Sequence, residues 1–175
     1  MGEKPKSVPL KRPRFFAGQM LSATDLDAGQ EYFLERQRRH NRSFHGYGVV
    51  SGLDVAIKNN VLSVSDGMAL DPVGNEIVVP SCFEMPIKQR GRRAYVIARY
   101  DERETDPVPV QIDSNGGVEF SRIEEAFQIV IAANPDSGAR KSVRAEIEPH
   151  VILAKLVMSR GRWRVDPKFR RSRAR

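Results

Sequence analysis

The sequence has one cysteine, Cys82, among 175 residues, and only three histidines. A single cysteine excludes an intrachain disulfide, so the fold must rely on its core, and a reducing compartment is the natural default. Cys82 follows Pro80 and Ser81 in an apolar strand context. That context favours an inert, packed thiol over a reactive one.

Long hydrophobic runs are also missing. The longest, Ile129 to Ala133 and Val151 to Ala154, are far shorter than the roughly 20 residues of a membrane-spanning helix. The lysines near the N-terminus are not followed by the apolar segment of a signal peptide. We therefore expect no membrane-spanning segment, no secretory signal peptide and synthesis in the cytoplasm.

Patterns of common catalytic sites are absent as well, including GxSxG, GxxxxGK[ST], HExxH and paired CxxC. His40 and His45 are five residues apart, on different faces of a regular helix, whereas a helical metal pair needs a spacing of three or four. Acidic clusters near residues 101–106 and 124–125 leave a carboxylate hydrolase as a weaker alternative. The sequence therefore predicts no enzyme, no metal and no cofactor.

The net charge of +7 is concentrated at the two ends of the chain. We expect an extended basic arm over residues 1–14 and a basic, solvated C-terminal tail over 167–175, which docks on a neighbouring protein or on nothing. Nucleic-acid binding is the less favoured alternative. Tyr95 and Tyr100 lie on opposite faces of a strand, and Trp163 suits a core position better than a stacking platform.

One strong helical pattern is present within residues 15–48. Ser22 and Thr24 are good N-caps, and Asp25 follows Ser22 by three residues, as in a capping box. A partly apolar face carries Leu26, Phe33, Gln37, His40 and Phe44. Four arginines on the other side form the candidate protein interface: Arg36, Arg38, Arg39 and Arg42.

The helix ends in a glycine-rich stretch that leads into the first strand. Gly46 is suited to a left-handed helix end. The polar side chains here are expected to satisfy backbone groups left over at that end. The candidate structural corner consists of His40, Asn41, His45, Gly46, Tyr47 and Gly48.

From Leu53 onward the apolar period changes from about 3.6 to 2, which indicates strands. Two hairpins are predicted, one turning at Asn59-Asn60 and one over residues 71–75. With further short strands, residues 49–166 form a β domain. The predicted class is α+β: a mainly antiparallel β sandwich or barrel preceded by one long N-terminal helix. Turn residues over Asp101 to Gly117 predict a projecting loop, which motivates an alternative function as a carbohydrate-binding or cell-surface-binding module.

Two stretches of the chain form recognisable motifs, RPRFFAGQMLSATDLDAGQEYFLERQRRHNRSFHGYGVVSGLDV and LSVSDGMALDPVGNEIVV. In these motifs the chain resembles small proteins encoded with phage-tail-like contractile injection systems and contractile phage tails. The resemblance covers roughly Arg12 to Ile131 and excludes the tail after Val165. It implies a non-enzymatic structural component of the baseplate, spike or fibre region, without catalytic residues. The implied partners are other subunits of the particle, with this chain as a homo-oligomer or in many copies.

Overall fold

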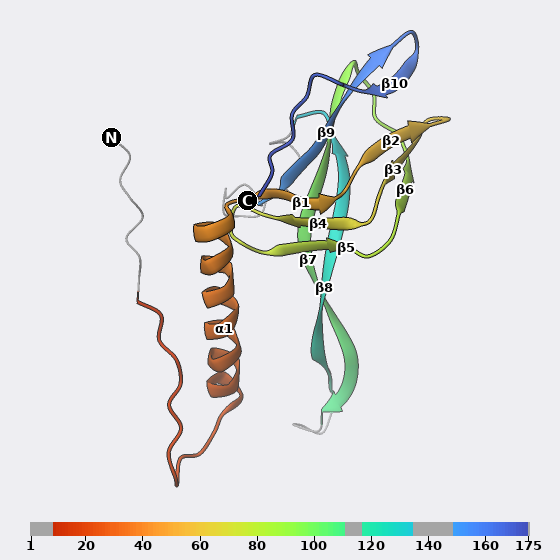
Figure 1. Cartoon of the computed structure of the whole chain (residues 1–175). Coiled ribbons are helices and arrows are strands. Elements are labelled where there is room, and N and C mark those ends of the chain that lie inside the picture. Colours follow the sequence, from red (N-terminus) through yellow and green to blue (C-terminus); the bar gives the residue numbers. More distant parts are fainter. Residues whose placement is uncertain (1–8, 111–116, 135–148, 175) are drawn as a thin grey trace.

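The computed structural model describes residues 9–110, 117–134 and 149–174 (Figure 1). Helix α1 (Ala23–His40) continues into a π-helical turn, η1 (Asn41–His45), and strands follow. The strands are β1 (Gly48–Gly52), β2 (Val55–Lys58), β3 (Val61–Val64), β4 (Gly67–Leu70), β5 (Glu76–Val79), β6 (Phe83–Pro86), β7 (Arg93–Val110), β8 (Gly117–Ala132), β9 (Val151–Ser159) and β10 (Arg162–Val165).

The strands form three antiparallel sheets, with the orders β1-β4-β5, β2-β3-β6 and β10-β9-β7-β8. Together with the N-terminal helix they confirm the α+β class. Both predicted hairpins are present, and Asn59 and Asn60 adopt φ values of 50° and 62° at the first turn. Asparagine tolerates this left-handed conformation better than most residues, which is why the sequence marks the turn.

The three sheets share one hydrophobic core. Its members all follow the helix in sequence, from Val49 to Trp163, and α1 contributes no buried residue. Trp163 is 6% exposed, as expected for a core position. Cys82, in contrast, is exposed rather than packed, because it lies in the bend between β5 and β6, so the predicted inert packing is wrong. No helix among the described residues has the length and apolar character needed to cross a membrane.

The predicted loop at Asp101 to Gly117 is wrong for most of its length. Residues 101–110 continue β7, and pairing with β8 runs to Val110 opposite Gly117, while residues 111–116 lie outside the described part. Beyond Ala98, β9 no longer pairs with β7, so a two-stranded ribbon projects from the body (Figure 1). Pro107 and Pro109 are two residues apart on β7, so the backbone nitrogen atoms of both face the same outer edge of the strand. Proline is tolerated on an open edge, and so its presence does not prevent a strand.

The C-terminal tail stays largely exposed, but it docks on its own chain. Its backbone follows β1, where the Val49 N–H donates to Ser172 O at 2.9 Å and the Ala174 N–H donates to Val49 O at 3.2 Å. The Arg171 guanidinium donates to Leu53 O at 2.7 Å and contacts Asp54 at 2.9 Å. The backbone bonds show that the tail covers the free edge of β1 within its own chain. Arg171 adds to this docking, because one guanidinium group contacts both a carbonyl and a carboxylate.

Candidate protein interface

The β4–β5 turn is built around Asp71, whose side chain is fully buried. Asp71 Oδ1 accepts hydrogen bonds from the backbone N–H groups of Val73, Gly74 and Asn75 at 2.8, 2.8 and 3.0 Å, and Oδ2 accepts from Asn75 Nδ2 at 2.8 Å. A carboxylate that accepts several backbone donors is stabilised in its buried position. The turn is therefore rigid and presents Gly74 and Asn75 to the helix.

The C-terminal half of α1 and the start of η1 are fixed to this turn by polar contacts. Asn41 Nδ2 donates to Gly74 O at 3.0 Å, and Gln37 Nε2 donates to Glu76 Oε1 at 2.8 Å. Asn41 is buried, so the bond satisfies an amide that would otherwise be costly to bury. A Cβ atom on Gly74 would lie 2.2 Å from Arg38 O, which shows how closely the turn approaches the helix backbone.

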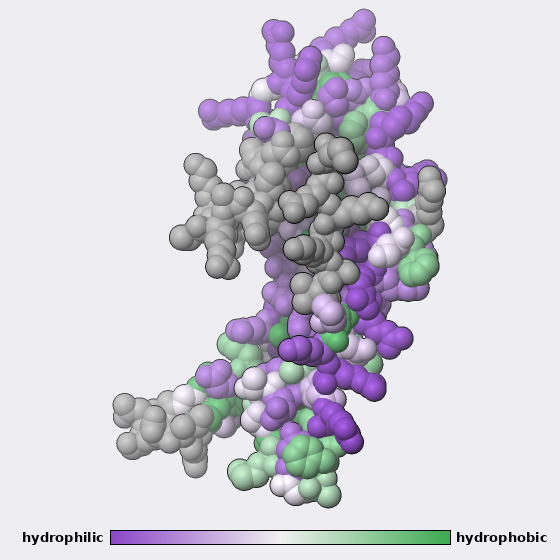
Figure 2. All heavy atoms as spheres, turned by 90° about the vertical axis from the view of Figure 1, so that its left-hand side faces the viewer, coloured by the Kyte–Doolittle hydropathy of each residue, from purple (hydrophilic) through white to green (hydrophobic). Residues whose placement is uncertain are grey.

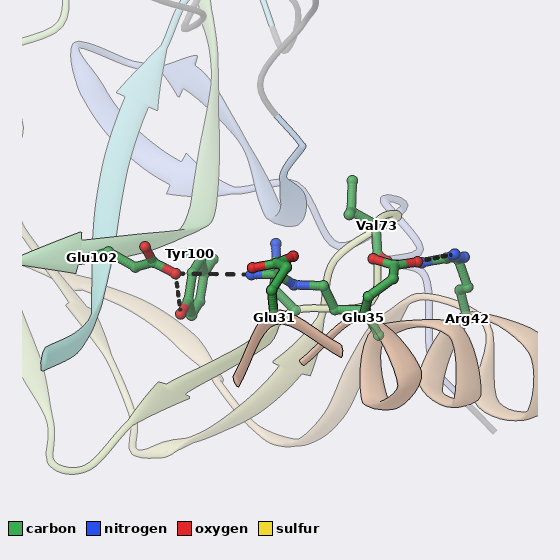
Figure 3. A network of polar contacts seen from close by, with 8 residues as sticks. Glu31, Glu35, Arg42, Val73, Tyr100 and Glu102 are labelled. Carbon is green, nitrogen blue, oxygen red and sulfur yellow. Dashed lines mark hydrogen bonds and ion pairs between the residues drawn. The ribbon is translucent and has the colours of Figure 1, made fainter. Parts of the chain in front are cut away.

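Arg38 joins the helix to the base of the ribbon. Its Nε donates to Asn75 Oδ1 at 2.7 Å, and its Nη2 lies 3.8 Å from Glu102. The Tyr100 hydroxyl donates to the same Glu102 carboxylate at 2.9 Å (Figure 3). Burial, reinforced by that hydrogen bond, raises the pKa of Tyr100, so the phenol keeps its proton and remains a donor.

The four predicted interface arginines divide into two pairs. Arg42 donates to Val73 O at 2.9 Å and pairs with Glu35 at 2.6 Å (Figure 3). Arg38 and Arg42 thus hold the helix on its own body. Arg36 and Arg39 lie on another side of α1, are exposed, and have no ion pair among the described residues. Only this second pair is available to a neighbour.

The predicted corner contains a π turn that a regular helical spacing does not anticipate. The rings of His40 and His45 lie 5.5 Å apart, and the ring of Phe44 lies 4.8 Å from that of His40. Their placement on different faces, inferred from the spacing of five, is wrong because a π turn brings residues five apart onto one side. Within the described residues, however, no group of three or more His, Cys, Asp or Glu side chains is placed to hold a metal ion.

The remaining corner residues set the path into β1. Gly46 adopts φ 72° and ends the helical segment. Gly48 has φ 131°, and a Cβ atom there would lie 2.5 Å from the carbonyl carbon of Ser172, so its missing side chain makes room for the tail. Tyr47 is 53% exposed. The corner therefore combines a fixed backbone with an aromatic side chain left on the surface.

An apolar surface runs over the segment before α1, the helix and the corner. We call it the helix surface. It gathers at the lower end of the face shown in Figure 2, where the chain turns before α1. Pro13 lies 4.0 Å from the Cβ position of Gly29, so part of the basic arm follows the helix. Its large apolar members are each more than half exposed: Phe15, Phe16, Met20, Leu21, Leu26, Phe33, Phe44 and Tyr47.

The residues that seat the helix on the body, Asp71, Gly74, Asn75 and Glu76, were not recognised as contacts from the sequence. Their pattern, LDPVGNE, marks a turn but does not show what the turn touches. Gln37 was assigned to the partly apolar face, and the structure gives that position a hydrogen bond to Glu76. A polar residue on an otherwise apolar stripe was the available signal.

No protein-family model matches the sequence, and no curated protein matches it. Three solved structures resemble the fold. A chain of the TssK–TssF–TssG baseplate subcomplex of the type VI secretion system has a TM-score of 0.57 and 13% identity, and the match covers 93% of this chain and 62% of that one. For TssK the values are 0.54, 11%, 90% and 41%, and for a chain of the type VI secretion baseplate complex they are 0.52, 13%, 94% and 60%. This chain spans less than two thirds of each, and what it shares with these baseplate structures is the fold.

Proposed function

We propose that this chain is a non-enzymatic structural subunit of a contractile injection particle, in the baseplate, spike or fibre region, and that it assembles through the helix surface. Two observations support a role in such a particle. The fold also occurs in type VI secretion baseplate structures, and the helix and first-hairpin motifs resemble proteins encoded with phage-tail-like systems. The alternative as a carbohydrate-binding module loses its motive, because the loop on which it rested is largely the β7–β8 ribbon.

The observation that carries the proposal is an 18-residue helix without one buried residue. Most of the stability of a helix in a protein comes from the packing of its apolar face rather than from helix propensity. Here Leu26 and Phe33 are 52% and 65% exposed, and Arg36 and Arg39 of the same helix are exposed without acidic partners among the described residues. Aromatic and arginine side chains on one exposed surface are typical of protein interfaces.

Co-assembly with the particle tests the role. Deletion of the gene is expected to prevent assembly or contraction, and normal firing without the protein would contradict the proposal.

The double variant L26D/F33D is expected to fold but to be absent from purified particles. The matched control V50D/V78D places the same charges at half-exposed valines of the β body, and it is expected to assemble. Equal incorporation of both variants would rule out the helix surface.

A further inference from the structure

The end of the body opposite the projecting ribbon is strongly basic. Three segments without any acidic residue meet there, namely residues 57–62, 86–96 and 157–165. The Ile87 N–H donates to Asn60 O at 3.0 Å, and the Met158 N–H donates to Arg92 O at 2.9 Å, so the three segments are in direct contact. Long hydrophilic side chains project from this upper end in Figure 2. We call it the basic end.

The basic end carries eight exposed cations, and none has an ion pair among the described residues. Elsewhere in the chain Arg38, Arg42, Lys155 and Arg171 are paired with carboxylates. Like charges gathered on one surface repel one another and create a positive potential that attracts anions. The eight residues are Lys58, Lys88, Arg90, Arg92, Arg93, Arg160, Arg162 and Arg164.

A groove of about 700 Å³ crosses the basic end between the β2–β3 and β9–β10 turns. It is lined by β2 and β10, each of which is the outermost strand of its sheet. Asn60 Nδ2 donates to Ile87 O at 3.0 Å and thereby fixes one wall. Edge strands present unpaired backbone groups, and an extended peptide can bind along them.

The side chains of β10 give this groove a repeat. Arg162 and Arg164 alternate with buried Trp163, so both side chains leave the strand on its outward face, from positions about 6.6 Å apart along the backbone. An extended peptide repeats its side chains at the same interval. Guanidinium groups bind carboxylates through paired, charge-assisted hydrogen bonds. A peptide with an acidic residue at every second position therefore matches the groove in both charge and spacing.

We propose that the basic end binds an extended acidic segment of another protein. The proposal is independent of the helix surface and of the particle in which the chain works. A nucleic acid fits less well, because single-stranded binding surfaces rely on exposed aromatic rings, and Trp163 in this groove is 6% exposed. The carboxylate groups of the acidic segment pair with cations that have no acidic partner among the described residues.

Fluorescence anisotropy with a labelled peptide of alternating Glu and Ser tests the proposal on the full chain. Binding is expected, with an affinity that falls as salt is raised. The double variant R162E/R164E should weaken it by more than about tenfold, since each lost guanidinium contact is charge-assisted. The matched control R36E/R39E changes the net charge equally on the helix surface and should bind like the wild type. If R162E/R164E fails to fold, R90E/R92E replaces cations in the adjoining loop.

Three results of this binding experiment would overturn the proposal. Failure of the unmodified protein to bind the Glu–Ser peptide removes it, as does equal weakening by R162E/R164E and R36E/R39E, which would show a response to net charge alone. Tighter binding of an oligothymidylate with the same number of charges would identify a nucleic-acid surface instead. Particle incorporation of L26D/F33D is a separate measurement, so failure here and failure of the proposed function remain distinguishable.

Discussion

Gly74 determines how closely the β4–β5 turn can approach the helix. It has φ 103°, and an added Cβ would meet the carbonyl oxygen, carbonyl carbon and Cα of Arg38 at 2.2 to 2.9 Å. Gly74→Ala is expected to lower the free energy of unfolding by about 1–3 kcal/mol or to displace the helix. Gly91→Ala is the matched control, because Gly91 has φ 116° but no atom within 4 Å of its Cβ position. Equal losses in chemical denaturation would show that the approach to Arg38 adds nothing to backbone strain.

Arg38 and Arg39 are neighbours with separate expected effects. Arg38→Gln removes a bond from a side chain that is only 22% exposed, and it leaves Asn75 without that donor. We expect a loss of about 1.5–3 kcal/mol, the range for hydrogen bonds to charged groups. Arg39→Gln changes an exposed side chain and should alter stability by less than about 0.5 kcal/mol. Thermal unfolding measures both, and a larger loss for Arg39→Gln would contradict the assignment of the two arginines.

At the scale of elements, the start of α1 is held by a capping box. Asp25 N donates to Ser22 Oγ at 3.2 Å, and Ser22 N donates to the Asp25 carboxylate at 3.0 Å. Ser22→Ala is expected to speed hydrogen exchange at Asp25 and Leu26, because a lost N-cap weakens a helix start by about 1 kcal/mol. Global unfolding should hardly change, since no residue of α1 is buried. Equal loss of protection in the β core would contradict this separation.

The same box gives the helix start a pH dependence. The hydrogen bond from the Ser22 side chain, followed by the one from its backbone, lowers the pKa of Asp25 from 3.8. A lowered pKa means that the charged carboxylate stabilises the folded helix start above the ordinary pKa, and that this contribution is lost as pH falls through the lowered value. Protection factors at the first turn, which are corrected for the intrinsic pH dependence of exchange, should therefore fall in acid, and Asp25→Asn should abolish that fall. An unchanged acid response in Asp25→Asn would assign it to another group.

Elements were predictable from the sequence where local chemistry decides them. Ser22 and Asp25 mark the helix start, and Asn59-Asn60 mark a hairpin, because each acts through its own backbone. The ribbon was missed because proline and glycine near residues 107–117 favour loops locally, while the cross-strand pairing of β7 with β8 decides the structure. The π turn and the docking of Arg171 on Leu53 depend on tertiary contacts that no local pattern records.

For the whole molecule, the chain divides into a β body that holds the hydrophobic core and a helix whose apolar surface is not covered by any of the described residues. Every member of the hydrophobic core lies at or after Val49, and polar contacts such as that of Asn41 with Gly74 join the helical segment to the body. These contacts could be predicted neither in partner nor in geometry, since Asn41 and Gly74 are 33 residues apart. The core, in contrast, could be predicted from the alternation of apolar residues after Leu53. In each strand this alternation marks the face that is buried, whatever the arrangement of the sheets.

This division predicts that a variant lacking residues 1–45 still unfolds in one cooperative transition. Its core is intact, and the tail still covers β1 through the bonds of Val49 to Ser172 and Ala174. The melting temperature should fall at least as far as in Arg38→Gln, because the bonds of Arg38, Gln37 and Asn41 to the β4–β5 turn and β5 are lost together. Removal of residues 171–175 is the contrasting variant, since it leaves the helix in place but opens the β1 edge, and open edges promote association. Circular dichroism and light scattering distinguish the two, and a non-cooperative transition after the N-terminal deletion would show that the helix belongs to the folding unit.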